Sequence, residues 1–309
     1  MNTIEVPERN VKVEFPSCWG EMDEEQFACV VQNWLKLMDG KINPDEFMLI
    51  VLYNFMGIKR GPFHDWKDKR LSREQLEDKF ANVWQLTELL TWLIRVEDTE
   101  DGPTGFLNYT EIRNRMPELE NDGGVFILGP ADAMIDITFG EYRRAWAHFE
   151  AYTLNRKHID LDRLIATLYR PVRENYNELK HRPDFDGHKR EPFNPYLTDH
   201  YAELLKKVPF WKKYIVYTWF GNCDKFIKEE ELELDGRPLT FAPLFTRKKQ
   251  TDEELETLDE NDLGLTGLLY MIAESKLFGD SSQVDRTDYI DILTALLYWK
   301  QQADKIRKP

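Results

Sequence analysis

Two helical patterns follow each other directly in residues 139–171, and they constrain the fold more than any other stretch of the chain. In each pattern apolar side chains recur at spacings of three and four residues, which places them on one face of an α-helix. The first set is Tyr142, Ala145, Trp146, Phe149 and Tyr152, and the second is Leu161, Leu164, Ile165, Leu168 and Tyr169. The pair predicts an αα-hairpin whose two aromatic-rich faces turn toward a common core.

The ends of these two helices are also marked in the sequence. Residues 155–158 form the predicted connection, and Asp160 is placed to accept a hydrogen bond from a free amide in the first turn of the second helix. Pro171 ends that helix, because the residue before a proline is pushed out of the helical region.

Similar signals predict helices elsewhere. Three helix starts carry capping signals: Asp23 with Gln26, Asn43 with Pro44, and Ser72 with Gln75. For the helix after Ser72 the predicted buried positions are Leu76, Phe80, Val83, Trp84, Leu90 and Leu93. Apolar spacing predicts further helices over residues 201–208, 211–220, 265–272 and 289–297.

Two segments favour β-hairpins. In the first, a short apolar run at 125–128 is followed by a Gly-Pro turn and by Ile135, Ile137 and Phe139, which alternate with polar residues. In the second, residues 232–241 contain a two-residue Asp235-Gly236 turn. Residues 4–15 fit a short strand or an extended arm, 98–121 lose all periodicity, and 247–262 form a charged linker.

These elements together predict a mainly α fold, a bundle of antiparallel helix pairs with one or two small β-hairpins. The irregular stretch 171–195 offers a boundary between two helical subdomains, residues 1–175 and 176–309. One continuous domain remains the alternative, since a chain of 309 residues fits either arrangement.

Charge and cysteine content narrow the class of protein. The formal net charge is −15, so the chain as a whole repels phosphates, which disfavours nucleic acid and anionic membranes as partners. Three cysteines without metal-type spacing indicate reduced thiols in a cytoplasmic compartment. No secretory signal and no membrane span are expected from the apolar runs.

Three local clusters could form binding sites, but a non-binding interpretation is preferred for each. The basic, aromatic stretch 58–71 around His64 and Trp66 favours a solvated loop over a nucleic-acid site. The acidic residues 98–101 lack the spacing of a calcium loop. The polar residues His181, Asp184, Asp186, His188, Glu191 and His200 match no metal-ligand spacing. We therefore expect no metal and no cofactor.

Motifs of catalysis are not found either. The sequence lacks the nucleophile elbow, the zinc-protease helix and the phosphate loop. Glu141, Arg144 and His148 share one helical face and could form an acid–base cluster. We prefer a row of ion pairs on the solvent side of the helix, with His158 as a loop residue. No catalytic residue is assigned.

Four pieces of the chain carry a resemblance to a known group of proteins. They are VFILGPADAMIDITFGEY (125–142), the aromatic helix that follows it, LIATLYRP (164–171) and GLTGLLYMIAESKLFGD (264–280). In order and wording they resemble proteins encoded in tail or structural gene clusters of phages and prophages of Bacteroidetes bacteria, loosely tail-assembly chaperones. The resemblance spans about half the chain and carries over no site residues.

The resemblance implies a non-enzymatic protein that binds other phage proteins, in the bacterial cytoplasm or on the virion, as an assembly chaperone or a structural component. Two alternatives stay open from the residues themselves. One is an enzyme whose site is dispersed in the sequence, which predicts a deep pocket with convergent His, Asp and Arg. The other is an acidic regulator that mimics nucleic acid. An exposed apolar patch would favour the protein-binding function over both alternatives.

Overall fold

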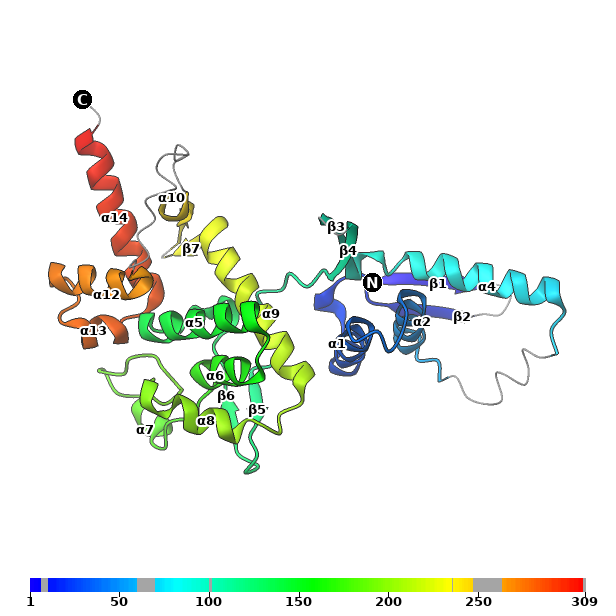
Figure 1. Ribbon diagram of the computed structural model, residues 1–309, viewed down its shortest axis with the longest axis horizontal. Coiled ribbons are helices and arrows are strands. Elements are labelled where there is room, and N and C mark those ends of the chain that lie inside the picture. The colour runs from blue at the N-terminus through cyan, green and yellow to red at the C-terminus, as the bar shows by residue number, and fades with distance from the viewer. Residues whose placement is uncertain (7–10, 60–69, 100–101, 235, 247–262, 308–309) are drawn as a thin grey trace. The chain divides into compact units, whose positions relative to one another are not determined.

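A computed structural model describes residues 1–6, 11–59, 70–99, 102–234, 236–246 and 263–307 (Figure 1). The fold is mainly α-helical with small two-stranded antiparallel sheets, as the sequence predicts. The chain divides into two compact units, Met1–Glu111 and Ile112–Pro309. The division predicted at 175/176 does not coincide with this one. It falls inside the second unit, where Glu141 and Arg190 form an ion pair across it.

The first unit is built from two hairpins and three helices. In chain order its elements are β1 (Asn2–Val6), β2 (Val11–Phe15), α1 (Glu24–Met38), α2 (Pro44–Phe55), α4 (Arg73–Glu88), β3 (Ile94–Thr99) and β4 (Gly102–Leu107). All three predicted helix starts are confirmed, and each forms a capping box in which a side chain and a backbone amide bond reciprocally. Trp19 anchors the core, with edge-to-face contacts to Phe27, Trp92 and Tyr109.

The β3–β4 hairpin lies in the stretch where the sequence predicts only irregular structure. The reason is visible in its burial, because every residue of β3 after Ile94 is exposed. A ribbon that buries neither face needs no alternation of apolar and polar residues. The period-two signal is therefore absent even though the strands pair from Ile94–Leu107 to Thr99–Gly102.

Helix α4 is present as predicted, but the prediction of which of its side chains are buried is wrong. Leu90 and Leu93 are buried, yet both follow the end of the helix. Phe80 and Trp84, predicted as core positions, are 57% and 51% exposed. The spacing of the apolar residues was sufficient to predict the helix and insufficient to predict what covers it.

The second unit is organised around the predicted αα-hairpin, which is confirmed as α5 (Phe139–Asn155) and α6 (His158–Leu168). Figure 1 shows these two helices side by side, with α9 packed against α6. The remaining elements are β5 (Glu118–Glu120), β6 (Phe126–Leu128), α7 (Tyr176–Leu179), α8 (Thr198–Leu204), α9 (Phe210–Glu229), β7 (Glu231–Leu234), β8 (Arg237–Thr240), α10 (Ala242–Phe245), α12 (Gly264–Ser275), α13 (Ser281–Arg286) and α14 (Tyr289–Arg307).

Two local predictions in this unit are wrong. Residues 135–139 are not a strand, because β6 pairs with β5 instead, and the chain then forms a tight turn in which Ala133 and Met134 have positive φ. Asp160 does not cap α6, since the helix begins earlier, at His158 after Lys157. The β7–β8 hairpin is confirmed, with Gly236 at φ +72 in its turn.

A glycine in the first turn of α5 allows a close helix contact. A Cβ atom at Gly140 would lie 2.8 Å from the backbone carbonyl oxygen of Asp285 in α13. No real Cβ tolerates that distance, and a backbone atom cannot rotate away. The absence of a side chain at Gly140 therefore sets how closely α13 approaches α5.

Replacing Gly140 with alanine should destabilise the protein, although Gly→Ala inside a helix normally stabilises it by up to about 1 kcal/mol. The clash with Asp285 explains the reversal, and urea unfolding would measure it. Gly267→Ala in α12 is the matched control, because its Cβ would meet only the side chain of the exposed Leu263. Equal stability of the two variants would contradict the assigned packing.

Candidate functional site: an arginine-lined cleft

The second unit contains a cleft of about 1240 Å³ between the start of α5, the segment 170–197 and α13. Its lining is dominated by charged side chains that come from distant parts of the sequence. The cations are Arg143, Arg144, Arg170, Arg173, Arg190, Arg286 and His188, and the acids are Glu141, Glu174, Asp186, Glu191 and Asp285.

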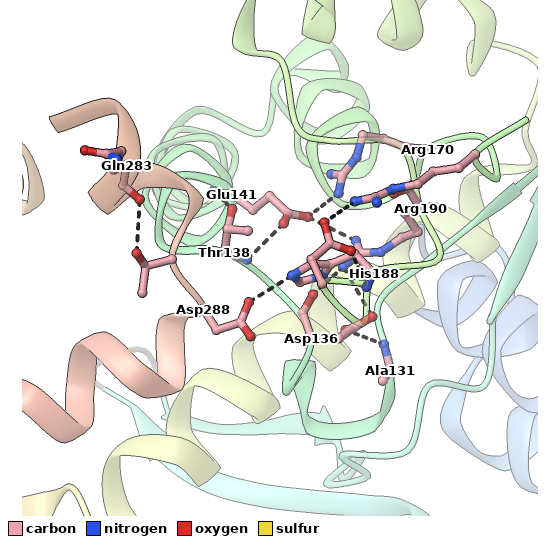
Figure 2. Close-up of polar contacts among 12 residues, drawn as sticks. Ala131, Asp136, Thr138, Glu141, Arg170, His188, Arg190, Gln283 and Asp288 are labelled. Carbon is pink, nitrogen blue, oxygen red and sulfur yellow. Dashed lines mark hydrogen bonds and ion pairs between the residues drawn. The ribbon is translucent and has the colours of Figure 1, made fainter. Parts of the chain in front are cut away.

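The lining of the cleft includes a buried carboxylate between two buried guanidinium groups, whose contacts Figure 2 shows. Glu141 is 1% exposed, and its Oε1 accepts from Arg170 at 2.7 Å and from Arg190 at 3.1 Å. Its other oxygen accepts the backbone N–H of Thr138 at 2.9 Å. We call these three charged residues, Glu141, Arg170 and Arg190, the buried cluster.

Local structure places each member of the buried cluster. Glu141 is the third residue of α5, so the capping box with Thr138 directs its carboxylate back toward the helix start. Arg170 follows α6 and forms a bridge with Leu128, while Arg190 forms a bridge with Val172. These short antiparallel bridges bring two segments, twenty residues apart in sequence, to the same end of α5.

The remaining N–H groups of the two arginines are satisfied by the backbone. Arg170 donates to the carbonyl oxygens of Glu191 and Thr167, both at 2.7 Å. Arg190 donates to the carbonyls of Leu168 at 2.7 Å and Asp136 at 2.8 Å. Buried charges are tolerated when they are paired and hydrogen-bonded in this way.

Burial alone would raise the pKa of Glu141, but the nearby Arg170 and Arg190 outweigh it and hold the pKa below its ordinary value. Burial lowers the pKa of Arg170, and Glu141 opposes that shift. Glu141 and Arg170 therefore both remain charged at neutral pH, because the ordinary pKa of arginine is about 12.5.

The walls of the cleft hold three further ion pairs. Arg143 on α5 binds both carboxylate oxygens of Asp285, at 2.9 and 3.2 Å, and so ties α5 to α13. Arg173 contacts Asp186 at 2.7 Å. The Nε2 of His188 lies 3.0 Å from Oδ1 of Asp288, which directly precedes α14.

Two further guanidinium groups line the cleft, those of Arg144 and Arg286. Among the residues that the structure describes, neither Arg144 on α5 nor Arg286 at the end of α13 has an acidic partner. Both side chains are exposed. They are therefore available to an anionic group from outside the chain, whereas the other cations of the cleft are already engaged.

The structure separates the residues that the sequence grouped as a charged row on α5. Glu141 is buried in the cluster, so the preferred solvent-side interpretation is wrong for it. Arg144 lies at the exposed wall of the cleft. His148 is half-buried, and burial, followed by the charge of Arg163, lowers its pKa. His158 is the first residue of α6 and packs its ring against Phe210.

The structure describes the candidate histidine cluster but not most of the basic and acidic candidate segments. Within the described residues no three His, Cys, Asp or Glu side chains gather closely enough to hold a metal ion. Of the candidate histidines, His188 is instead engaged with Asp288. The basic residues 60–69 and the acidic residues 100–101 lie outside the described part of the chain.

Sequence reasoning missed a second polar network, which lies inside the aromatic core. The Tyr142 hydroxyl donates to Asp224 at 2.7 Å, and Lys228 contacts the other oxygen of Asp224 at 2.8 Å. Burial raises the pKa of Tyr142, so its hydroxyl keeps the proton that it donates. The Tyr142 ring also stacks on Tyr289 at 3.8 Å, which joins α5, α9 and α14.

A capping pattern could have located part of the site. Thr138 followed by Glu141 fits the capping box that correctly predicted three other helices, and it places the carboxylate at the helix start. No comparable signal exists for Arg170 and Arg190. Their partner is distant in sequence, and arginines are common on surfaces.

Replacing Glu141 with glutamine should destabilise the protein by about 3–5 kcal/mol, because two buried guanidinium groups lose their carboxylate. Urea unfolding at neutral pH measures the loss. Glu77→Gln is the control, since its ion pair with Arg73 is exposed and is worth less than about 1 kcal/mol.

The same variant should show a pH dependence. The pKa of Glu141 in the folded state lies below its ordinary 4.5, so its contribution is present above pH 4.5 and is lost as the pH falls through the lower folded value. The stability gap between wild type and Glu141→Gln should therefore narrow in acid. A gap that stays constant would contradict the ionised state assigned to Glu141.

His188 should titrate above its ordinary pKa of 6.5, because the hydrogen bond to Asp288 favours the charged ring and outweighs burial. The stabilisation by this pair is complete below pH 6.5 and is lost as the pH rises through the raised folded value. An NMR titration of the ring should show the pKa falling in Asp288→Asn. An unchanged pKa would mean that Asp288 is not the partner.

In the described part of the chain, none of the helices is both long and apolar enough to cross a membrane. Comparison with known proteins adds no relative: the chain matches no protein-family model, no curated protein and no solved structure.

Proposed function

We propose that this chain acts by binding another protein and not by catalysis. The observation that carries the proposal is the exposed aromatic face of α4 in the first unit. Phe80 and Trp84 lie one helical turn apart and are 57% and 51% exposed, and Leu89 just beyond the helix is 41% exposed. Large aromatic side chains on a surface are the usual anchors of protein interfaces.

The composition of α4 supports the same function. Its mean polarity is that of a solvated helix, with charged residues such as Arg73, Glu77 and Lys79 along its length. Two large aromatic rings on such a helix bury little within their own unit and cost solubility. A partner that covers them would recover the hydrophobic free energy that folding leaves unused.

The arginine-lined cleft does hold the convergent His, Asp and Arg side chains that the enzyme alternative expects. Their pairing argues against a catalytic role. A general base needs a free lone pair and a pKa near the working pH. Glu141 instead has a lowered pKa and contacts from two arginines and a backbone amide, while His188 is engaged with Asp288.

The partner in this proposal is a structural or tail protein of a phage particle, and the chain is an assembly chaperone or a structural component. This part rests on the resemblance of residues 125–142, 164–171 and 264–280 to phage and prophage tail-cluster proteins. We propose the bacterial host cytoplasm or the virion as its location.

The test is capture of a tagged chain from its native host, with partners identified by mass spectrometry and the complex mass measured under native conditions. We expect a particle protein at fixed stoichiometry with wild type, and loss of that protein with Phe80→Ser/Trp84→Ser, because the exposed anchors are removed. Val96→Ser is the matched control, since Val96 is a 65% exposed apolar residue elsewhere in the same unit. Capture that survives the double substitution would contradict the proposal.

A further inference from the structure

We propose that the arginine-lined cleft of the second unit binds an acidic peptide segment of a partner protein. The inference concerns a different unit and a different chemistry from the α4 face, and it does not depend on that face. It begins from two guanidinium groups of the cleft wall that no described acid binds. Arg144 and Arg286 line the same cleft, one on α5 and one at the end of α13, and neither has an acidic partner among the described residues.

The other cations of the cleft explain why these two are the recognition groups. Arg143 and Arg173 are held by Asp285 and Asp186, so a ligand would have to break an ion pair to use them. Arg144 and Arg286 require no such exchange. The planar guanidinium fork pairs well with a carboxylate and can donate two parallel hydrogen bonds to it.

The buried cluster adds a long-range attraction. Two buried guanidinium groups share the single buried carboxylate of Glu141, and the nearest further acid, Asp136, is 35% exposed and lies 3.4 Å from Arg190. Water screens Asp136 more than it screens the buried arginines. This part of the lining therefore carries a positive potential in a chain whose net charge is −15.

The acids of the lining favour a peptide over a nucleic acid. Glu174 and Glu191 stand among the arginines, and a continuous row of phosphates would meet them as like charges. A peptide carries spaced carboxylates for Arg144 and Arg286. Its backbone N–H groups can donate to the acids and to the side chain of Asn175.

The size and rim of the cleft also fit a peptide. Its volume of about 1240 Å³ exceeds the range of roughly 300–1000 Å³ that is common for small-molecule pockets. One rim presents Tyr196, which is 92% exposed, beside Leu197, which is 39% exposed. These apolar surfaces can contact side chains between the ligand's carboxylates, as in other interfaces where aromatic residues and arginine occur together.

The Nε atom of Arg143 is a buried donor for which a bound ligand could supply the acceptor. The Nε of Arg143 is inaccessible to solvent and has no hydrogen-bond partner among the described residues, although Nη2 of the same side chain donates to both oxygens of Asp285 and Nη1 donates to Thr266. A buried donor without an acceptor is costly. An acceptor from a ligand beside Arg143 could satisfy this Nε while Nη2 keeps its ion pair with Asp285.

The experiment measures fluorescence anisotropy of the full-length protein with a short labelled peptide of alternating glutamate and glycine. A second peptide carries glutamine at every glutamate position, and inorganic phosphate serves as a competitor. The test variant is Arg144→Glu/Arg286→Glu. The control is Arg237→Glu, which makes one such charge reversal at an exposed residue on β8, outside the cleft.

We expect saturable binding of the glutamate peptide that weakens with salt and is at least about tenfold weaker in the double variant, because two attractions become two repulsions. Arg237→Glu should bind like wild type, and the glutamine peptide should not bind. Arg144 and Arg286 are exposed and make no ion pair with another described residue, and Arg237 is exposed as well, so circular dichroism should show both variants folded.

Three results would overturn the proposal. If the double variant and Arg237→Glu bind the glutamate peptide equally well, the cleft is not its binding site. Equal binding of the glutamine peptide would remove charge recognition. Full displacement of the peptide by phosphate at the peptide's own affinity would identify a site for free phosphate in its place. Each of these outcomes leaves the α4 proposal intact, because that proposal is tested with variants in the first unit.

Discussion

The second unit depends on one carboxylate. Glu141 lies at the start of α5 and accepts from Arg170 after α6 and from Arg190 at the end of the irregular segment. Each arginine then uses its other N–H groups to bind backbone carbonyls. The buried cluster thus replaces an apolar core in a region of the chain that has few apolar residues and little regular secondary structure. Removing one partner would leave a charge buried without compensation, which costs far more than an exposed pair contributes.

The parts of the fold that the sequence predicts well are the local ones. A capping box uses residues three apart, and the αα-hairpin uses apolar residues three and four apart, so both are contained in a short window. The failures come from pairing across longer distances. Ile135 and Ile137 alternate like a strand, but β6 takes β5 as its partner and both residues lie outside any strand. The exposure of Phe80 depends on what packs against α4, which its own spacing does not encode.

The candidate site was largely unpredictable for the same physical reason. Arg170 and Arg190 look like ordinary surface arginines in the sequence, because nothing local distinguishes a guanidinium that will be buried. Their partner Glu141 is predicted on the solvent face, because it shares one helical face with Arg144 and His148. What the sequence did contain was the capping signal at Thr138, which fixes the position of the carboxylate before any arginine reaches it.

The order of the buried cluster along the chain has a consequence for synthesis on the ribosome, where the N-terminal part of a protein emerges first. The α5–α6 hairpin is complete once Leu168 has emerged, and Arg170 follows at once. The second guanidinium arrives with Arg190, and Tyr289, which stacks on Tyr142, arrives near the end of the chain. In the nascent chain, the Glu141 carboxylate and the aromatic face of the hairpin therefore stay in contact with water until the later segments are translated. Ribosome-bound chains that end before Arg190 or Tyr289 lack the contacts that these residues make with α5.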